Sequence, residues 1–429
     1  MSTFSTAGAT IDLVPPPELC DPYDMTKYSI IERIGEGTFS VVYRAKRNVT
    51  NATKSVCDLE GVDPGVVALK CIHPNSSPTR ILNELQHLKI LSGQNSVLPL
   101  LGGFRARCGF IVILPYFEHD DFKWYLPRLS TAMLQCYLKG LFLALAHVAN
   151  HGIIHRDIKP RNYLFSMEKR QGLLIDFGLA QGPSEWQPIF EAKGIAWDGS
   201  KLVSSSRRSS TSRKSRSDKK RSTASSADHD AENVAPKLKR KRSMGRGITS
   251  SGAVDSGAAS NSNKPPARVR AERAGTPGFR APEVLFMSLE QTPAIDMWSA
   301  GVIMLSLLSS RYPIFPKPER GPISSDAQAI AQIEALLGRD ALERAARACH
   351  KDLIETPGDR NPISPPSLKD LCEQGRKVFF DAILKKQPNH SPLDKFPDSV
   401  YDLLHRCLEV EPERRISAKD ALSHSFFSV

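Results

Sequence analysis

The sequence predicts an α+β fold in which strands come first and helices follow. Runs rich in β-branched and aromatic residues lie between residues 28 and 116, broken by one amphipathic helical run. Long apolar runs with helical character follow at residues 133–151 and from Asp296 onward. Strands segregated from helices in this order are typical of an α+β domain.

Length and composition indicate a soluble intracellular enzyme. The 429 residues are 40% hydrophobic and 24% charged, enough for two or three domains of roughly 150 residues each. The eight cysteines show no C-x-x-C pair, which argues for a reducing compartment and against a zinc finger or a disulfide framework. The N-terminus lacks a secretory signal, and the longest apolar run, around residues 300–308, is too short to span a bilayer. We therefore expect no membrane contact.

The net charge of +12 is concentrated in one segment. Residues 201–246 contain fifteen Lys and Arg against four Asp and Glu, a net charge of +11. The rest of the chain is close to neutral. This pattern indicates a near-neutral domain that carries a basic insertion, and it argues against a domain built to coat nucleic acid.

A flexible leader rich in Ser, Thr and Pro, residues 1–26, precedes two strands joined at a Gly turn. Gly35 and Gly37 would let the backbone approach phosphate oxygens, and Val42 on the return strand would cover a purine face. Ser40 stands where the third Gly of such a loop is expected. Alone the pattern is weak evidence for nucleotide binding, because Gly turns between strands are common. It is not a Rossmann fingerprint, since a strand follows it.

Lys70 lies within the apolar strand V-V-A-L-K-C-I, after a long polar loop at residues 47–64. A lysine there is costly to bury unless it is paired, so it either snorkels outward or meets a carboxylate. Glu84 is the candidate partner, because it lies beside the apolar stripe of the next helical run. The strand at residues 109–116 should then lead to a connector, with Leu114 at the back of a base pocket and the backbone of Pro115–Phe117 facing the base.

The strongest chemical signal is G-I-I-H-R-D-I-K-P-R-N, followed at hairpin distance by D-F-G. It places Asp157, Lys159 and Asn162 on one loop and Asp176 just after it. Phosphoryl transfer needs a base for a hydroxyl, a cation for the moving phosphoryl group and oxygen ligands for Mg²⁺. This spacing supplies all three.

Residues 181–272 are dominated by Ser and Arg, with few aromatics and no periodicity. Such a segment cannot bury enough apolar surface to offset its ordering entropy, so we expect it to be disordered. It contains the basic cluster P-K-L-K-R-K-R at residues 236–242. The cluster is either a solvated charge block, a nuclear import signal read by an importin, or a contact for chromatin or another acidic partner.

Order is expected to return at A-G-T-P-G-F-R-A-P-E-V-L. Thr276 can hydrogen-bond between Asp157 and Lys159, and Glu283 needs a buried cation, for which Arg415 is the candidate. Asp296, at the start of a very apolar helix, can hold the backbone of the Asp157 loop. A polar, insertion-like stretch at residues 351–397 should precede two closing helices.

Together these stretches resemble the eukaryotic protein kinase family across residues 28–427. The resemblance implies a bilobal fold, with an antiparallel β small lobe and a mostly helical large lobe. The insertion at residues 181–272 would fall in the activation segment, dividing the domain into 27–180 and 273–429. ATP and Mg²⁺ are the implied cofactors, and Ser or Thr the implied substrate residues.

The resemblance also implies roles for single residues. Asp157 would be the catalytic base or orient the substrate hydroxyl, with Lys159 on the γ-phosphate and Thr276 completing the catalytic set. Asn162 and Asp176 would ligate Mg²⁺, while His155 and Phe177 would join Leu88 in an internal hydrophobic column. The implied ATP-binding residues are Ile34, Gly35, Gly37, Val42, Ala68, Lys70, Glu84, Leu114, Tyr116 and Leu164.

A narrower resemblance is to the Dbf-dependent kinases, the cell-division-cycle kinases that start DNA replication. It rests on G-E-G-T-F-S-V-V-Y, L-P-Y-F-E-H-D-D-F, I-D-M-W-S-A-G-V-I-M-L and the long insertion between D-F-G and A-P-E. This implies a nuclear kinase, active with a Dbf-type regulatory subunit, that phosphorylates MCM helicase subunits. The insertion contains no Cys, so a zinc-binding element there is not supported.

Arg273 and Arg280 flank the turn that would receive the residue after the target hydroxyl. Two guanidinium groups there favour a carboxylate or phosphate, unless one or both pair internally with acidic side chains. The other functions considered are a different nuclear Ser/Thr kinase of cyclin-dependent-like or casein-kinase-like type, a pseudokinase scaffold, and a chromatin tether acting through the insertion.

Overall fold

The residues that this computed structural model describes all fall within the segments Met1–Ser205 and Val269–Val429. They are residues 5–6, 9–10, 27–37, 40–48, 62–91, 93–106, 109–183, 274–316, 324–351, 353, 365–385 and 394–428. Beyond Pro183, the expected insertion lies outside the described residues, with its basic cluster at 236–242, and so does Arg273. Within the expected leader, which was predicted to lack strands, β1 (Ser5–Thr6) and β2 (Ala9–Thr10) form a short antiparallel pair.

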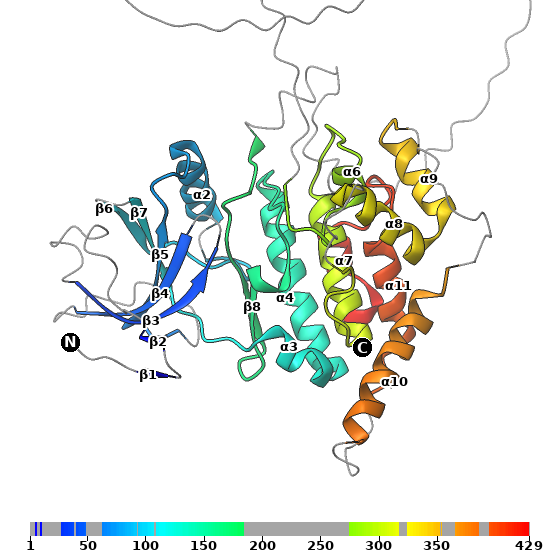
Figure 1. The fold of residues 1–429 in the computed structure, drawn as a ribbon, viewed down its shortest axis with the longest axis horizontal. Coiled ribbons are helices and arrows are strands. Elements are labelled where there is room, and N and C mark those ends of the chain that lie inside the picture. Colours follow the sequence, from blue (N-terminus) through cyan, green and yellow to red (C-terminus); the bar gives the residue numbers. More distant parts are fainter. Residues whose placement is uncertain are drawn as a thin grey trace, which may run out of the picture. The chain divides into compact units, whose positions relative to one another are not determined.

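Five antiparallel strands form the sheet of the N-terminal part, in the order β3-β4-β5-β7-β6 (Figure 1). Their bounds are β3 Tyr28–Glu36, β4 Ser40–Arg47, β5 Val66–Ile72, β6 Gly102–Ala106 and β7 Gly109–Pro115. The central strand β5 is the most buried of the five, because it has neighbours on both edges and apolar side chains on both faces. Lys70 therefore lies in the middle of the sheet.

Helix α2 (Pro78–Leu91) follows β5 in the chain and lies beside the sheet (Figure 1). Its buried side chains are of two kinds. Leu88 and Leu91 join the main hydrophobic core, whereas Glu84 is 5% exposed and turns toward the charged groups of the sheet. The helix thus connects the sheet with the helical part of the domain.

A short hairpin separates the sheet from the later helices. It consists of β8 (Tyr163–Ser166) and β9 (Gln171–Leu174). Leu174 anchors it to the segment after α2, since its amide donates to the carbonyl of Ser96 at 2.7 Å and its carbonyl accepts from the amide of Leu98 at 3.0 Å. The residues on either side of this hairpin, 152–162 and 175–182, therefore lie at a junction held from several directions.

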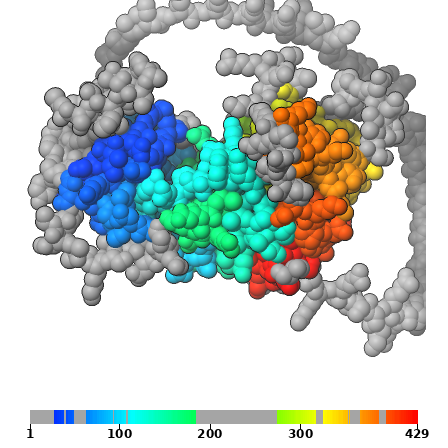
Figure 2. All heavy atoms as spheres, turned by 90° about the horizontal axis from the view of Figure 1, so that it is seen from below, coloured from blue at the N-terminus to red at the C-terminus, as the bar shows by residue number. Residues whose placement is uncertain are grey.

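The C-terminal part of the domain consists mainly of helices. Their bounds are α3 Phe122–Tyr125, α4 Thr131–Asn150, α6 Pro282–Leu285, α7 Ala294–Ser309, α8 Ser325–Leu337, α9 Arg339–Ala348, α10 Leu368–Leu384, α11 Asp398–Cys407 and α12 Ala418–Leu422. In α7 every residue after the first is buried. The end of the chain closes on α4 (Figure 2), where Gln135 donates to the carbonyl of Phe426 at 2.7 Å and Phe142 meets Phe427 edge to face.

By length and composition, α4 is the one helix among the described residues that could cross a membrane, with a mean hydropathy of 1.4. The expectation from the sequence concerned residues 300–308, which lie in the shorter helix α7. Half of the apolar stretch of α4 is buried inside the protein, and Tyr137, Leu141 and Phe142 have no exposed surface. The central helix of a folded domain passes the same test.

The polar stretch at residues 351–397 differs from its description as an insertion. It contains α10, a helix of 17 residues that packs along α7. Gly375 makes this approach possible, since a Cβ there would lie 2.5 Å from the carbonyl oxygen of Ser309. The rest of the architecture, an antiparallel sheet followed by packed helices, confirms the predicted α+β fold class.

Candidate active site

The loop that carries Asp157 is held by a side chain from the first turn of helix α7. The buried carboxylate of Asp296 accepts the backbone N–H of His155 at 2.7 Å and that of Arg156 at 2.8 Å. Burial raises the pKa of Asp296, and these amides, together with His155, oppose that rise. Arg156 adopts a left-handed φ of 68°, a conformation that a non-glycine residue keeps only where its surroundings impose it. The loop conformation is therefore set by tertiary contacts.

Asp157 lies at the centre of a hydrogen-bond network. Its Oδ1 accepts the Thr276 hydroxyl at 2.7 Å and the Thr276 amide at 3.1 Å. Its Oδ2 accepts from Lys159 Nζ at 2.6 Å and from Asn162 Nδ2 at 3.0 Å. Lys159 Nζ also donates to Thr276 Oγ1 at 2.9 Å, which is the expected bridge between Asp157 and Lys159.

This network fixes a carboxylate in one orientation beside an ammonium group. Asp157 is 7% exposed, and the Lys159 side chain is 21% exposed, so the cation is the more accessible of the two. A carboxylate held in this way can accept a proton from a hydroxyl, and the adjacent ammonium can stabilise negative charge that develops nearby. The arrangement is suited to transfer of an anionic group to a hydroxyl.

Lys70 joins the sheet, helix α2 and the loop after β9. Its Nζ donates to Glu84 Oε1 at 2.5 Å and to Asp176 Oδ1 at 2.8 Å. Burial alone would lower the pKa of Lys70, but the two carboxylates outweigh it and raise that pKa above its ordinary value. Burial opposes ionisation of Asp176 as well, yet the ammonium of Lys70 lowers its pKa to about 2. Lys70 and Asp176 are therefore both charged at neutral pH.

Asp176 and Asn162 come together through the backbone, since the amide of Ile175 donates to the carbonyl of Asn162 at 2.9 Å. Asp176 adopts a φ of 67°, and its carboxylate is 42% exposed. No group of three His, Cys, Asp or Glu side chains that could hold a metal ion occurs among the described residues. One carboxylate and one amide oxygen still fit Mg²⁺, which keeps several waters and binds through few protein ligands.

Phe177, next to Asp176, is buried against His155. Their rings meet edge to face with centroids 4.8 Å apart. His155 also pairs through Nε2 with the carbonyl of Ile175 at 3.0 Å. Leu88 of α2 belongs to the same core cluster as Phe177.

Several of the predicted nucleotide-binding residues occupy paired positions on neighbouring strands of the sheet. Gly35 pairs with Val42, Val42 with Lys70, and Ala68 with Leu114. Leu114 and Leu164 both pack against one small cluster of buried apolar side chains. Ile34 is exposed, Gly37 bonds to the carbonyl of Ser40 across the turn at 2.8 Å, and the Tyr116 ring lies 5.1 Å from the guanidinium of Arg44.

The segment after Thr276 is fixed by a buried ion pair. Arg415 binds Glu283 through both carboxylate oxygens, at 2.7 and 3.1 Å, and neither side chain is more than 1% exposed. Arg415 donates in addition to the carbonyls of Ala294 at 2.8 Å and Glu409 at 2.7 Å. This is the pairing expected for Glu283.

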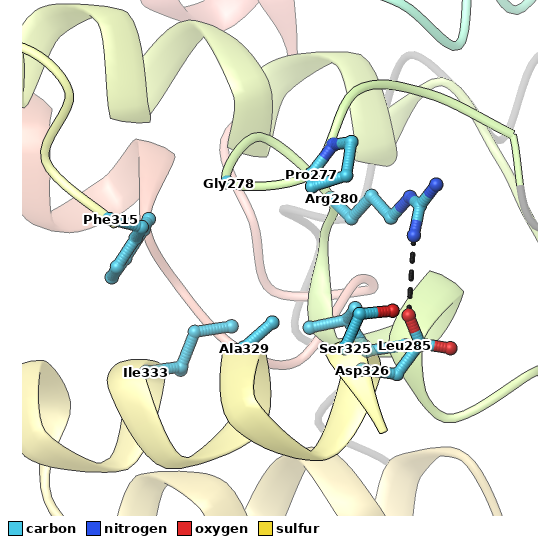
Figure 3. Close-up of a pocket in the computed structure, with 9 residues that line it drawn as sticks. All are labelled: Pro277, Gly278, Arg280, Leu285, Phe315, Ser325, Asp326, Ala329 and Ile333. Carbon is cyan, nitrogen blue, oxygen red and sulfur yellow. Dashed lines mark hydrogen bonds and ion pairs between the residues drawn. The ribbon is translucent and has the colours of Figure 1, made fainter. Parts of the chain in front are cut away.

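Arg280 is engaged inside the protein. Its Nε donates to the carbonyl of Gly275 at 3.0 Å, and its Nη1 lies 3.2 Å from Asp326 Oδ1 at the start of α8. Figure 3 shows this ion pair at one end of a pocket whose other end is lined by Phe315 and Ile333. The internal pairing left open for Arg280 is therefore present, and the side chain is 16% exposed.

Two residues at this site did not emerge from the sequence. Arg80 of α2 donates through Nε to the carbonyl of Gly178 at 2.6 Å, and Asp326 binds Arg280. The signal for Arg80 was present, because it precedes Glu84 by four residues and so lies on the same face of a helix. For Asp326 there was no local signal, since its partner is 46 residues away.

The chain is similar to known proteins over most of its length. A model of the protein kinase domain matches residues 28–189 and 253–427. The chain is 34% identical to a probable cell division control protein 7 homolog of Encephalitozoon cuniculi, over 94% of this chain and 92% of the relative. It is 33% identical to the cell cycle serine/threonine-protein kinase hsk1 of Schizosaccharomyces pombe, over 93% and 72%, and 29% identical to the mouse cell division cycle 7-related protein kinase, over 96% and 92%.

Proposed function

Since the chain belongs to the protein kinase family, and within it to the cell division cycle 7 type of Ser/Thr kinase, we propose that it phosphorylates acidic nuclear proteins to start DNA replication. The substrates proposed are MCM helicase subunits. The observation that carries the proposal is the Asp157 carboxylate, held by Thr276, Lys159 and Asn162 beside the Lys70–Asp176 pair.

The proposed cofactors are ATP and Mg²⁺. Lys70, held by Glu84, would bind the α- and β-phosphates, and Asn162 and Asp176 would hold the metal. The metal, when bound, neutralises charge on the phosphates. Asp157 would accept or orient the hydroxyl of the substrate, and Lys159 would contact the γ-phosphate. The exposed Ile34 and the facing pairs Gly35–Val42 and Ala68–Leu114 support a base-binding cleft at this end of the sheet.

The proposed substrate preference is for an acidic residue just after the target Ser or Thr. Arg273 and Arg280 would bind it. The bonds of Arg280 to Gly275 and Asp326 engage two of the five N–H donors of a guanidinium, so a substrate carboxylate can bind the same group. Its pairing with Asp326 also fixes the orientation of the side chain before substrate arrives.

We propose a Dbf-type regulatory subunit as the activator and the nucleus as the location. In this proposal residues 181–272 form a basic insertion between the two halves of the domain, and its cluster at 236–242 contacts an importin or chromatin. The support is compositional, since residues 201–246 carry nearly all the excess positive charge of the chain.

Phosphorylation of an acidic Ser peptide, with and without a Dbf-type subunit, tests the function. Asp157→Asn should lower the rate about 10²- to 10⁴-fold, because an amide cannot accept the hydroxyl proton. Asp398→Asn, a matched change in a surface pair whose carboxylate is 84% exposed, should leave the rate unchanged. An undiminished rate in Asp157→Asn would refute the role of Asp157. Equal activity without the subunit would refute the proposed activator.

A further inference from the structure

Helix α2 makes a second contact with the loop after β9, separate from the Lys70 bridge. Arg80 lies one helical turn before Glu84, and its Nε donates to the backbone carbonyl of Gly178 at 2.6 Å. Residues four apart on a helix share one face, so Arg80 and Glu84 reach the same loop side by side. A donor that carries charge makes a stronger hydrogen bond to a carbonyl than a neutral one does.

Gly178 lies where the charged groups of this site converge. A Cβ at Gly178 would lie 3.3 Å from Asp176 Oδ1, 3.3 Å from Glu84 Oε2 and 3.6 Å from Arg80 Nη2. The backbone at Gly178 therefore lies close to both acidic partners of Lys70. A shift of the Asp176–Gly178 turn would move the Asp176 carboxylate relative to Glu84.

Asp176 needs support that does not depend on its own side chain. Its φ of 67° lies in the left-handed region, which a residue with a Cβ keeps only where the surroundings hold it. Its carboxylate bonds to Lys70 at 2.8 Å. In the proposed function, Lys70 turns to phosphate and Asp176 to Mg²⁺, so this ion pair loosens when the site is filled. The Arg80 bond is made to the backbone and does not require that exchange.

We propose that Arg80 is a positioning residue that keeps the Asp176–Gly178 turn in its metal-binding conformation while the Asp176 carboxylate exchanges Lys70 for the metal. This inference rests on the proposed function, because it takes Mg²⁺ with ATP as the ligand. Arg80 itself contacts neither metal nor substrate.

Two measurements on the full chain test this role, with Arg80→Gln, Arg80→Lys and the control Lys89→Gln. Lys89 is an exposed residue of the same helix, so its substitution removes the same charge away from the turn. The first measurement is hydrogen exchange of residues 175–181 without nucleotide, where the amide of Ala180 bonds to the carbonyl of Phe177 at 3.0 Å. The second is the affinity for ATP with and without Mg²⁺.

We expect Arg80→Gln to speed exchange of this segment and to weaken ATP binding about tenfold in the presence of Mg²⁺, and less than about twofold in its absence. Arg80→Lys should recover part of both effects, since a lysine can donate to the same carbonyl, though without the planar geometry of a guanidinium. Lys89→Gln should match the wild type.

The inference is wrong if Arg80→Gln behaves like Lys89→Gln while the wild type binds ATP with Mg²⁺ and phosphorylates peptide; the proposed function then stands. It is also wrong if Arg80→Gln weakens ATP binding equally with and without Mg²⁺, since that result indicates general damage to the site. If the wild type fails to bind ATP with Mg²⁺, the proposed function falls and the inference falls with it.

Discussion

Replacing Arg415 with Met should lower the free energy of unfolding more than the substitution of a surface charge does. Arg415 and Glu283 are at most 1% exposed, and the guanidinium also binds the carbonyls of Ala294 and Glu409. Removing one partner of a buried ion pair leaves an uncompensated charge, which costs about 3–5 kcal/mol. Against a typical total stability of about 5–15 kcal/mol, that loss is large.

A double-mutant cycle gives the magnitude. We expect Arg415→Met to cost about 4 kcal/mol and Glu283→Gln about 3 kcal/mol. The double variant should lose about 4 kcal/mol rather than the sum of the two single losses. When both charges are removed together, no uncompensated charge stays buried. Urea unfolding followed by circular dichroism measures all three free energies of unfolding.

The control is a surface ion pair. Arg344 binds Glu411 at 3.0 Å, but its side chain is 41% exposed, so Arg344→Met should cost less than about 1 kcal/mol. A cost below about 1 kcal/mol for Arg415→Met, or strict additivity in the cycle, would show that Glu283 finds water or another cation and would refute the reasoning.

Three further predictions concern separate groups. Thr276→Val should lower the peptide phosphorylation rate about 10- to 100-fold, and Thr276→Ser should retain most of it, because the hydroxyl bridges Asp157 and Lys159; equal rates for the two variants would contradict this. The pKa of Asp176 is lowered to about 2, so its ion pair stabilises the fold above pH 4 and is lost as the pH falls toward 2. The stability difference between the wild type and Asp176→Asn should therefore vanish over that range, starting from less than about 1 kcal/mol because the carboxylate is 42% exposed. Burial raises the pKa of the Cys372 and Cys407 thiols to about 12, so iodoacetamide at pH 8 should label the partly exposed Cys71 and Cys136 before these two; mass spectrometry that finds Cys407 labelled equally fast would disprove it.

The contacts of Thr276 and Glu283 were predictable because the chemistry of each residue demands a partner. A buried carboxylate needs a cation, and the motif E-P-E-R-R-I-S near the end of the chain made Arg415 the candidate partner of Glu283. In the same way Lys70, within an apolar strand, required an acidic partner. These arguments depend on residue type and burial, both of which can be read from sequence.

The pairing of Arg280 and the extent of α10 were harder to foresee. From the sequence, Arg280 could bind either a substrate carboxylate or phosphate or an acidic side chain within the protein. The position of α8 supplies the internal partner, Asp326. Helix α10 buries only a few residues, among them Cys372 and Gly375, and Gly375 lies against Ser309 of α7. Its stability comes from that tertiary contact rather than from an apolar face, so periodicity alone does not reveal it.

The hydrogen bonds of Asp296 to the backbone of His155 and Arg156 have a consequence for the newly synthesised protein. The two ends of this contact are 141 residues apart, so the loop leaves the ribosome before the carboxylate that shapes it has been synthesised. At about 5–20 residues per second, that interval is on the order of ten seconds. During this time Asp157 also lacks Thr276. A nascent chain, or a fragment that ends before α7, should therefore contain every residue of the first half of the site and still be inert.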